Sequence, residues 1–245
     1  MSCFFISDSI INDMEISVNV YESGGFIGKK KVEVSEEKEF EFFLNDKKFI
    51  ALSASPRHLK EMSIGLLITY GLIEFDKADS VEVDIKGGRI YITAEVIGKG
   101  WLGKIKSEKM FRADVIYNSI GILNDSAKEW QKTGGTHNSC LMSEDGERIK
   151  CFEDIGRHNS LDKLIGWTAM NKIDLSDKFL LFSGRFSSEI VRKVLYVGFP
   201  LAISKSAPLS SGIELAKKNN LTLVGFARYP KFYVYTNSWR IVSCN

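Results

Sequence analysis

The sequence predicts an α/β protein in which a small β-rich N-terminal domain precedes a larger layered α/β domain. Three observations support this fold class. The first hundred residues show strand-like alternation around a single helix, the region after residue 112 alternates short apolar strands with helices, and a stretch rich in glycine and lysine separates the two. We expect domains over residues 1–100 and 112–245.

Composition excludes several classes of protein. The chain has 245 residues, of which 44% are hydrophobic and 26% charged, as expected for one large or two small globular domains. Its net charge is only +2, so neither nucleic acid nor a membrane surface is expected as a partner. The apolar runs are far shorter than the ~20 residues of a membrane span, and residues 1–10 lack the basic start of a signal peptide. We expect a reduced, cytoplasmic protein whose four scattered cysteines bind no metal.

The N-terminal domain is predicted to be mainly β with one helix. Mixtures of branched, aromatic and charged residues indicate strands over Lys30–Leu44 and Lys47–Ser53. A helix is expected over Pro56–Tyr70, because Ser55 can cap its start and Gly71 suits its end.

A hairpin is expected at Gly87-Gly88, because glycine tolerates the positive φ of a two-residue turn. The apolar residues on either side alternate with polar ones, which predicts one buried face. The register centred on this turn pairs Ile85 with Ile90 and Val83 with Ile92.

Residues Gly98–Arg112 interrupt this pattern. Three glycines and five basic residues surround Trp101 without periodicity, which predicts a loop and a domain boundary. Beyond it, strands and helices alternate, as in a partly parallel layered sheet. We expect helices over Ala113–Gln131, His158–Met170, Ser188–Val197 and Ser210–Lys218, a hairpin over Thr136–Glu153, and strands over Phe179–Phe182, Leu201–Ser204, Leu221–Phe226 and Phe232–Tyr235.

Four junctions between these elements concentrate glycine, arginine, histidine and hydroxyl residues. A glycine between a strand and a helix lets backbone approach a ligand, and the start of a helix offers free N–H groups to an anion. Arg157 and Arg185 lie beside such glycines, where a guanidinium can grip phosphate with two hydrogen bonds. One such turn is more often an ordinary turn with a solvated arginine, but four together indicate a nucleotide or dinucleotide site. The junctions are Thr133–His137, Glu153–Asn159, Ser183–Arg185 and Phe226–Lys231.

The histidines of these junctions are interpreted as ligand anchors. His137 and His158 have no cysteine or carboxylate partners at metal-ligand spacing, so metal binding is not expected. His58, near the start of the first helix, is expected to be structural.

A second two-residue turn is predicted at Asp145-Gly146. Pairing outward from it sets Cys140 opposite Cys151 as a hydrogen-bonded pair with Cα atoms ~5.5 Å apart. The two cysteines are interpreted as inert buried thiols or, as a weaker hypothesis, as catalytic candidates, and they are expected to stay reduced. The same register pairs Glu144 with Glu147 and Met142 with Ile149, and turns His137, Ser139 and Leu141 to the face away from Cys140.

Six blocks of sequence follow one another in a characteristic order. They are Ser55–Ile73, Thr133–His137, Glu153–Lys163, Ser183–Arg185, Ser206–Pro208 and Leu221–Thr236. These blocks resemble the signature blocks of the formate dehydrogenase accessory (FdhD) family. The resemblance extends from about Phe49 and is most specific from Thr133 onward.

The resemblance implies a cytidine-deaminase-like fold for the main domain, a homodimer, and a cysteine desulfurase and formate dehydrogenase as partners. Members of the family receive sulfur as a persulfide and pass it to the molybdenum bis(guanine dinucleotide) cofactor, of which GDP is a mimic. Deamination is not implied, because the zinc signature of deaminases is absent.

The block Phe226–Lys231 matches the family's cofactor-contacting segment, with Lys231 where arginine is common. Together with the junctions described above, the resemblance gives the candidate cofactor-binding residues. They are Gly134, Gly135, Thr136, His137, Asp154, Gly156, Arg157, His158, Asn159, Ser183, Gly184, Arg185, Phe226, Ala227, Arg228, Tyr229, Pro230 and Lys231.

The chain departs from the family pattern in one respect. The persulfide cysteine of the family belongs to a C-x-x-C loop, whereas the matching region Gly98–Tyr117 contains no cysteine. Persulfide chemistry needs a thiolate that attacks and is attacked, so we expect no stable persulfide on this chain. Three interpretations stay open: Cys140 or Cys151 has taken over, the chain binds cofactor without carrying sulfur, or it has another role. The chain is therefore interpreted as a sulfurtransferase-type maturation factor or as a non-catalytic cofactor-binding paralogue, and its residues favour binding over sulfur transfer.

Overall fold

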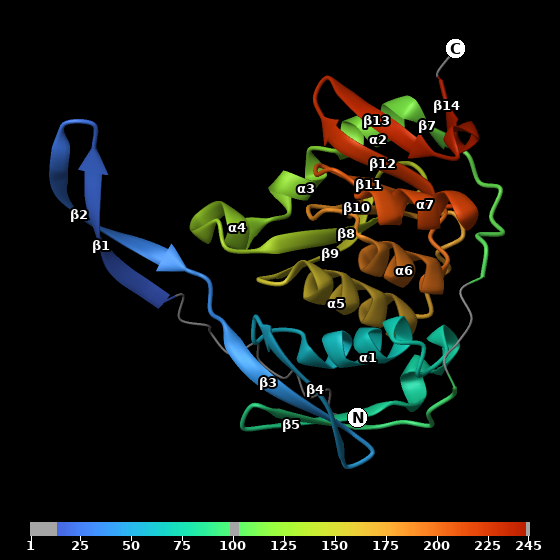
Figure 1. Ribbon diagram of the computed structural model, residues 1–245, viewed down its shortest axis with the longest axis horizontal. Helices are drawn as coiled ribbons and strands as arrows, with labels where there is room; N and C mark the ends of the chain where they lie inside the picture. The colour runs from blue at the N-terminus through green and yellow to red at the C-terminus, as the bar shows by residue number, and fades with distance from the viewer. Residues whose placement is uncertain (1–13, 99–102, 244–245) are drawn as a thin grey trace, which may run out of the picture.

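The computed structural model describes residues 14–98 and 103–243, and it confirms the α/β class. Figure 1 shows two sheets with helices packed between them, and a two-stranded arm that projects from the body. The cytidine-deaminase likeness and the domain boundaries stay predictions.

The larger sheet has six strands in the order β13-β12-β11-β10-β8-β9. Strands β10, β11 and β12 run parallel, and the other three pair antiparallel with their neighbours, so the predicted partly parallel sheet is confirmed. The strands are β8 (His137–Met142), β9 (Arg148–Asp154), β10 (Phe179–Phe182), β11 (Leu201–Ser204), β12 (Thr222–Arg228) and β13 (Lys231–Thr236), and the helices between them are α5 (Arg157–Met170), α6 (Ser188–Val197) and α7 (Ser210–Lys218).

The smaller sheet has the order β4-β3-β6-β5 and carries the predicted glycine hairpin. Gly87 and Gly88 have φ angles of 55° and 83°, and both predicted cross-strand pairs form. Ile90 is fully buried, but Ile85 is 45% exposed because β5 is the edge strand, so the predicted buried face is only partly correct. The strands are β3 (Lys38–Leu44), β4 (Lys47–Ala54), β5 (Glu82–Lys86) and β6 (Arg89–Thr93).

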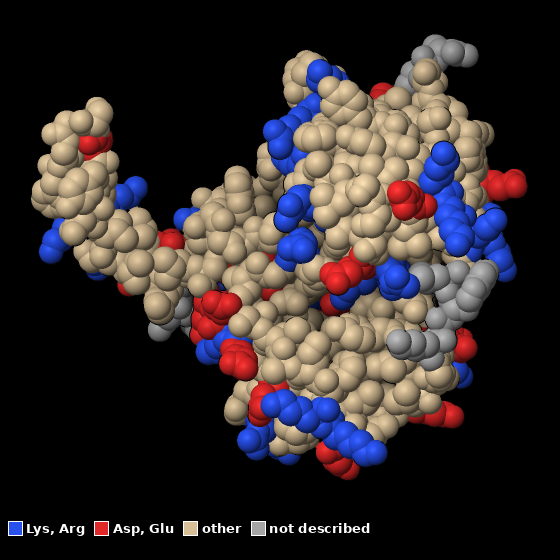
Figure 2. Space-filling view, viewed as in Figure 1, with Lys and Arg blue, Asp and Glu red and all other residues tan. Residues whose placement is uncertain are grey.

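Strands β1 (Met14–Glu22) and β2 (Gly25–Val34) form a hairpin, called here the arm, that the sequence analysis missed. The predicted strand Lys30–Leu44 is wrong as a single element, because residues 35–37 separate β2 from β3. In Figure 2 the arm stands clear of the body and shows mostly uncharged residues, whereas charges of both signs are scattered over the body. One face of the arm is mainly apolar and carries Met14, Ile16, Val18, Val20, Val32 and Val34, with Lys30 opposite Val18.

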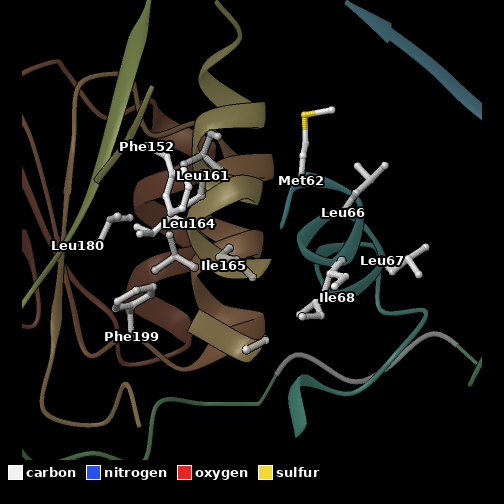
Figure 3. Close-up of a cluster of buried hydrophobic side chains, with 14 of the residues drawn as sticks. Met62, Leu66, Leu67, Ile68, Phe152, Leu161, Leu164, Ile165, Leu180 and Phe199 are labelled. Carbon is white, nitrogen blue, oxygen red and sulfur yellow. The ribbon is translucent and has the colours of Figure 1, made fainter. Parts of the chain in front are cut away.

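The six-stranded sheet separates two hydrophobic cores. Because side chains alternate along a strand, Leu141 and Leu180 face one core while Cys140 and Leu181 face the other. Figure 3 shows the first core, where side chains of α1 (Leu59–Thr69) lie opposite those of α5. The second core lies beneath α2 (Ala113–Ser119) and α3 (Ile122–Asp125).

Helices α1 and α5 touch backbone to backbone. A Cβ added at Gly166 would overlap the carbonyl oxygen of Glu61 and lie 2.8 Å from the amide nitrogen of Gly65. A Cβ at Gly65 would likewise overlap the carbonyl oxygen of Asp162. Glycine at both positions therefore lets the helix that covers the smaller sheet pack directly on the helix that covers the larger one.

Two buried ion pairs connect these layers. Asp154 and Lys163 are both fully buried, 2.5 Å apart, and the Asp154 carboxylate also accepts a hydrogen bond from the Ser55 amide. Ser55 therefore joins the two sheets and does not cap α1, which begins only after His58, so the predicted helix start is wrong. On the other side of α5, Lys193 lies 2.5 Å from the carboxylate of Asp162.

The single helix predicted over Ala113–Gln131 is wrong, because the structure has three short helices there. Ile120 and Gly121 separate α2 from α3, and Ser126 and Ala127 separate α3 from α4 (Lys128–Thr133). Short polar side chains compete for backbone hydrogen bonds and so disfavour a continuous helix. The carboxylate of Glu153 instead accepts hydrogen bonds from the first amides of α4, at 3.0 and 2.9 Å.

The predicted loop at Gly98–Arg112 is confirmed over residues 103–110, while 99–102, with Trp101, lie outside the described residues. Its last two residues form β7 (Phe111–Arg112), which pairs with β14 (Ile241–Val242). Short 3₁₀ helices lie at Phe75–Ser80 and Ser238–Arg240. Within the described ranges, no helix has the length and apolar character that crossing a bilayer requires.

The β8–β9 hairpin has the predicted cysteine pairing but not the predicted turn. Three residues, Glu144–Gly146, form the turn, with Gly146 at φ 82°. An unpaired residue on β9, Ile149, then shifts the register by one. The pairing of Cys140 with Cys151 is therefore confirmed, whereas the predicted pairs of Glu144 with Glu147 and of Met142 with Ile149 are wrong.

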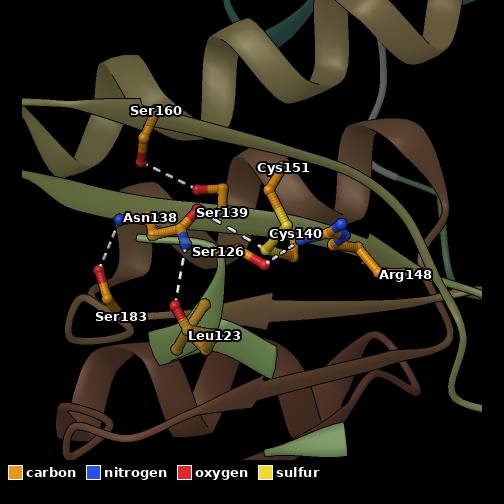
Figure 4. Close-up of a disulfide and its surroundings, with 9 residues drawn as sticks. All are labelled: Leu123, Ser126, Asn138, Ser139, Cys140, Arg148, Cys151, Ser160 and Ser183. Carbon is orange, nitrogen blue, oxygen red and sulfur yellow. Dashed lines mark hydrogen bonds between the residues drawn. A yellow bond between two sulfur atoms is a disulfide. The ribbon is translucent and has the colours of Figure 1, made fainter. Parts of the chain in front are cut away.

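Cys140 and Cys151 are joined as a disulfide (Figure 4), so the prediction of free thiols is wrong. Their Cα atoms are 4.1 Å apart, closer than the predicted hydrogen-bonded spacing. This is the short spacing of a non-hydrogen-bonded pair, which brings opposing side chains together. The predicted facing is confirmed for Ser139, whose hydroxyl lies 2.9 Å from Ser160 of α5 on the opposite side of the sheet.

Candidate functional site

A cavity of about 860 Å³, called here the main cavity, opens where three parallel strands end. Ser183 follows β10, Lys205 follows β11, and Arg228 is the last residue of β12. Ligands of open α/β sheets bind outside the carboxyl ends of the parallel strands. The volume also falls within the usual range for small-molecule sites, about 300–1,000 Å³.

The glycine turn after α4 forms one wall of this cavity. Gly134 ends α4 with a φ of 69°, a conformation that favours glycine. At Gly135 an added Cβ would lie 2.7 Å from the hydroxyl of Ser35, which comes from the segment between the arm and β3. The two glycines therefore present bare backbone to the cavity while Ser35 supports them from behind.

His137 and Arg157 supply polar groups beside this turn. The Nδ1 atom of His137 lies 3.1 Å from the hydroxyl of Ser183. Burial, followed by the charge of Arg157, lowers the pKa of His137, so its imidazole is neutral at neutral pH. The Nε atom of Arg157 is buried, and among the described residues no acceptor bonds to it. An unpaired buried donor of this kind suits an anionic ligand.

The remaining walls combine aromatic rings, amides and cations. The rings of Tyr117 and Tyr229 are 5.3 Å apart, and Trp130 is 47% exposed. Lys205 donates to the side chain of Asn124, and burial, then the charge of Arg228, lowers its pKa.

Sequence reasoning missed several of these lining residues. Only Lys205 could have been predicted from the sequence, because it directly follows a predicted strand. The other residues lie in the three short helices α2–α4, which were predicted as one helix, or within β8. The missed residues are Tyr117, Asn118, Asn124, Trp130, Asn138 and Lys205.

The structure divides the predicted ligand-binding residues into three groups. Those that line the main cavity are Gly134, Gly135, Thr136, His137, Ser183, Arg228 and Tyr229. Those that line a second cavity, of about 740 Å³ beside α1 and α6, are Gly156, His158 and Asn159. Those that line neither are Asp154, Arg157, Gly184, Arg185, Phe226, Ala227, Pro230 and Lys231.

Several members of the third group have structural contacts. Asp154 accepts hydrogen bonds from the Gly156 amide at 2.8 Å and from Asn159 at 2.9 Å, which fixes the start of α5. Gly184 lies against the ring of Phe182 and accepts a 2.7 Å hydrogen bond from Ser204.

Other predicted ligand-binding residues lie at the surface, and one lies in a β-bulge. Arg185 is exposed, and Lys231 lies 5.4 Å from the ring of Tyr233. Phe226 occupies a bulge of β12 with a φ of 48°. In residues 14–98 and 103–243, no three His, Cys, Asp or Glu side chains cluster as metal ligands.

Comparison with known proteins agrees with the order of the signature blocks. The family model of FdhD/NarQ matches residues 102–242. A protein of Bacillus pumilus named sulfur carrier protein FdhD is 35% identical over 91% of this chain and 95% of its own length. Protein FdhD of Methanocaldococcus jannaschii is 38% identical over 83% of this chain and 88% of its own length.

A solved structure supports the same assignment. The crystal structure of a formate dehydrogenase accessory protein from Desulfotalea psychrophila superposes with a TM-score of 0.82 and 27% identity, over 94% of this chain and 99% of that chain. The fold, the family model and the relatives therefore agree. The chain belongs to the FdhD/NarQ family of formate dehydrogenase accessory proteins.

Proposed function

We propose that this accessory protein binds the molybdenum bis(guanine dinucleotide) cofactor through one of its nucleoside diphosphate arms, in the main cavity. The observation that carries the proposal is the cavity itself, which gathers a bare glycine turn, Lys205 and Arg228 at the ends of parallel strands. The cofactor is cargo for formate dehydrogenase, the enzyme that the related accessory proteins are named for.

The chemistry of the walls suits both parts of a guanosine diphosphate. Lys205 and Arg228, which both line the cavity, offer charge-assisted hydrogen bonds to phosphate. Trp130 and Tyr229 offer exposed aromatic faces on which a purine can stack. Amide side chains such as Asn118 offer donors and acceptors to the edge of the base.

Calorimetry with GDP tests this proposal. Wild type should bind GDP, and Lys205→Ala and Arg228→Ala should each weaken binding by about 1.5–3 kcal/mol, because each removes a charge-assisted contact. Arg185→Ala serves as the matched control, since Arg185 is exposed and lines neither cavity, and it should keep wild-type affinity. Absence of binding by wild type at millimolar GDP would reject the site.

We extend the proposal to a homodimer with a cysteine desulfurase as a further partner, in the cytoplasm. The arm supports the dimer, because its apolar face is exposed: Met14 is 57% and Ile16 40% exposed. An isolated two-stranded hairpin is marginally stable in water, so this face is expected to be covered by a second copy.

Sedimentation velocity tests the dimer. Wild type should sediment as a dimer, and Ile16→Lys should shift it to monomer, because a charge would be placed on the apolar face of the arm. Ser17→Lys introduces the same charge on the other face and should leave the dimer intact. A wild-type protein that stays monomeric at high concentration would contradict the proposal that the arm forms a dimer interface.

The relatives are named sulfur carriers, and sulfur transfer is the second candidate function for this chain. One observation favours it despite the missing C-x-x-C loop. Two cysteines lie directly opposite each other on β8 and β9, which gives the chain a dithiol.

A further inference from the structure

The two cysteines of the β8–β9 hairpin differ in their access to solvent. Cys140 is fully buried on β8, inside the six-stranded sheet. Cys151 is half-buried on β9, the edge strand. An external reagent therefore reaches the sulfur of Cys151 more readily, while Cys140 lies behind it at a Cα separation of 4.1 Å.

The cysteine pair lies on the side of the sheet where the main cavity opens. Asn138, two residues before Cys140 and hence on the same face, lines that cavity. Leu123 lines the cavity too and shares a hydrophobic core with Cys140. Two residues of strand span about 7 Å, so the sulfur atoms lie close behind the cavity wall.

A basic side chain and a hydroxyl lie beside the cysteine pair. Figure 4 shows Arg148 and Ser126 beside the two sulfurs, and Arg148 donates a 3.1 Å hydrogen bond to the hydroxyl of Ser126. The thiolate is the form of a cysteine that attacks sulfur.

We propose that Cys151 and Cys140 form a dithiol that accepts sulfane sulfur from a persulfide and releases it as hydrosulfide. This inference rests on the proposed function only in that the main cavity would hold the sulfur acceptor. The geometry assigns Cys151 as the receiving residue, because it is the accessible one, and Cys140 as the resolving residue, because it lies directly opposite.

The reaction balances in two displacements. The thiolate of Cys151 attacks the outer sulfur of a donor persulfide, the donor's S–S bond breaks, and the donor leaves as a thiolate, so that Cys151 carries the persulfide. The thiolate of Cys140 then attacks the Sγ atom of Cys151, and hydrosulfide leaves with the electron pair and its proton. The sulfane sulfur gains two electrons, which the two thiols lose as they form the disulfide. A low-molecular-weight thiol restores the dithiol by exchange.

This scheme agrees with the expectation that the wild-type chain holds no stable persulfide. A persulfide on Cys151 would have the resolving thiol directly opposite, so it would be consumed as it forms. The family pattern of a loop-borne cysteine pair is thereby replaced by a pair held in a sheet.

The experiment treats the reduced full chain with glutathione persulfide, in a background where Cys3 and Cys244 are replaced by serine. Released hydrosulfide is measured, and intact mass is recorded after alkylation. With Cys140 and Cys151 present, we expect hydrosulfide release, a Cys140–Cys151 disulfide and no added sulfur. Cys140→Ser should lose the release and retain one added sulfur, mapped by peptide mass to Cys151. Cys151→Ser should lose both.

Two outcomes would overturn the assignment: both thiols remain free with no hydrosulfide released, or the added sulfur maps to Cys140. Cys140→Ala is the second variant, because it avoids burying a hydroxyl if the serine variant fails to fold. GDP calorimetry on the same proteins separates this inference from the proposed function. Loss of GDP binding with intact sulfide release rejects the nucleotide site alone, and the reverse result rejects the dithiol alone.

Discussion

Replacing Lys163 by methionine is expected to lower the free energy of unfolding by about 3–5 kcal/mol, because it leaves a buried carboxylate without its cation. Lys163 and Asp154 are both fully buried and lie 2.5 Å apart. Burial lowers the pKa of Lys163 and the charge of Asp154 opposes this, as expected for a pair withdrawn from water. The amine also donates to the Ser55 carbonyl at 3.2 Å, so the variant loosens the connection between the sheets.

Chemical denaturation followed by circular dichroism measures this loss. Lys48→Met is the matched control, because Lys48 forms an exposed ion pair with Glu41, and its effect should stay within about 0.5 kcal/mol. The double variant Asp154→Asn with Lys163→Met should recover part of the loss, since it removes the unpaired charge. Equal small effects of Lys163→Met and Lys48→Met would show that the buried pair does not stabilise the layers.

Replacing Gly166 by alanine is expected to destabilise the protein by about 3 kcal/mol, since the added methyl group has no space between α1 and α5. The new Cβ would overlap the Glu61 carbonyl oxygen, and backbone cannot rotate away as a side chain can. The helices would have to separate, which would also loosen the core packed around them.

Thermal and chemical denaturation of Gly121→Ala provide the comparison. Gly121 has helical backbone angles, with φ −60° and ψ −35°, and no atom lies within 4 Å of an added Cβ. Alanine there should be neutral or stabilise by up to about 1 kcal/mol, since it restricts the unfolded chain. If Gly166→Ala behaves like Gly121→Ala, the close helix crossing is not present in solution.

The elements that the sequence predicted well have strong local signals. Phe179–Phe182 and Leu201–Ser204 are short, mostly apolar runs that lie fully buried in the parallel part of the sheet, and both strands have the predicted bounds. The helix Ser188–Val197 also has its predicted bounds: Ser187 caps its start, and Gly198 ends it at a φ of 85°.

The elements that the sequence predicted poorly depend on contacts between distant segments. Ser55 is an acceptable helix cap in isolation, but Asp154 binds its amide and holds it elsewhere. The turn at Asp145-Gly146 suits two residues, yet the hairpin uses three and an unpaired Ile149 compensates, so a correct cysteine pair followed from an incorrect turn.

The main cavity was only partly predictable for the same reason. The glycine turn, His137, Ser183 and Arg228 carry local signals of a ligand site, and the fold brings them together. Arg185 carries the same signal but points to solvent, and Trp130 carries none although it lines the cavity. Which strand ends meet is decided by the sheet order, and a single junction contains no information about that order.

The base of the arm contacts the glycine turn that forms one wall of the main cavity. Ser35, at the base of the arm, hydrogen-bonds Thr133 at 2.7 Å and supports Gly135, and Glu33 pairs with Lys132 at 3.2 Å. A partner that repositioned Ser35 on binding the arm would therefore change the affinity of the cavity for a ligand. Thermodynamic reciprocity would then require a ligand in the cavity to change the partner's affinity by the same factor, so that the two binding equilibria would be coupled.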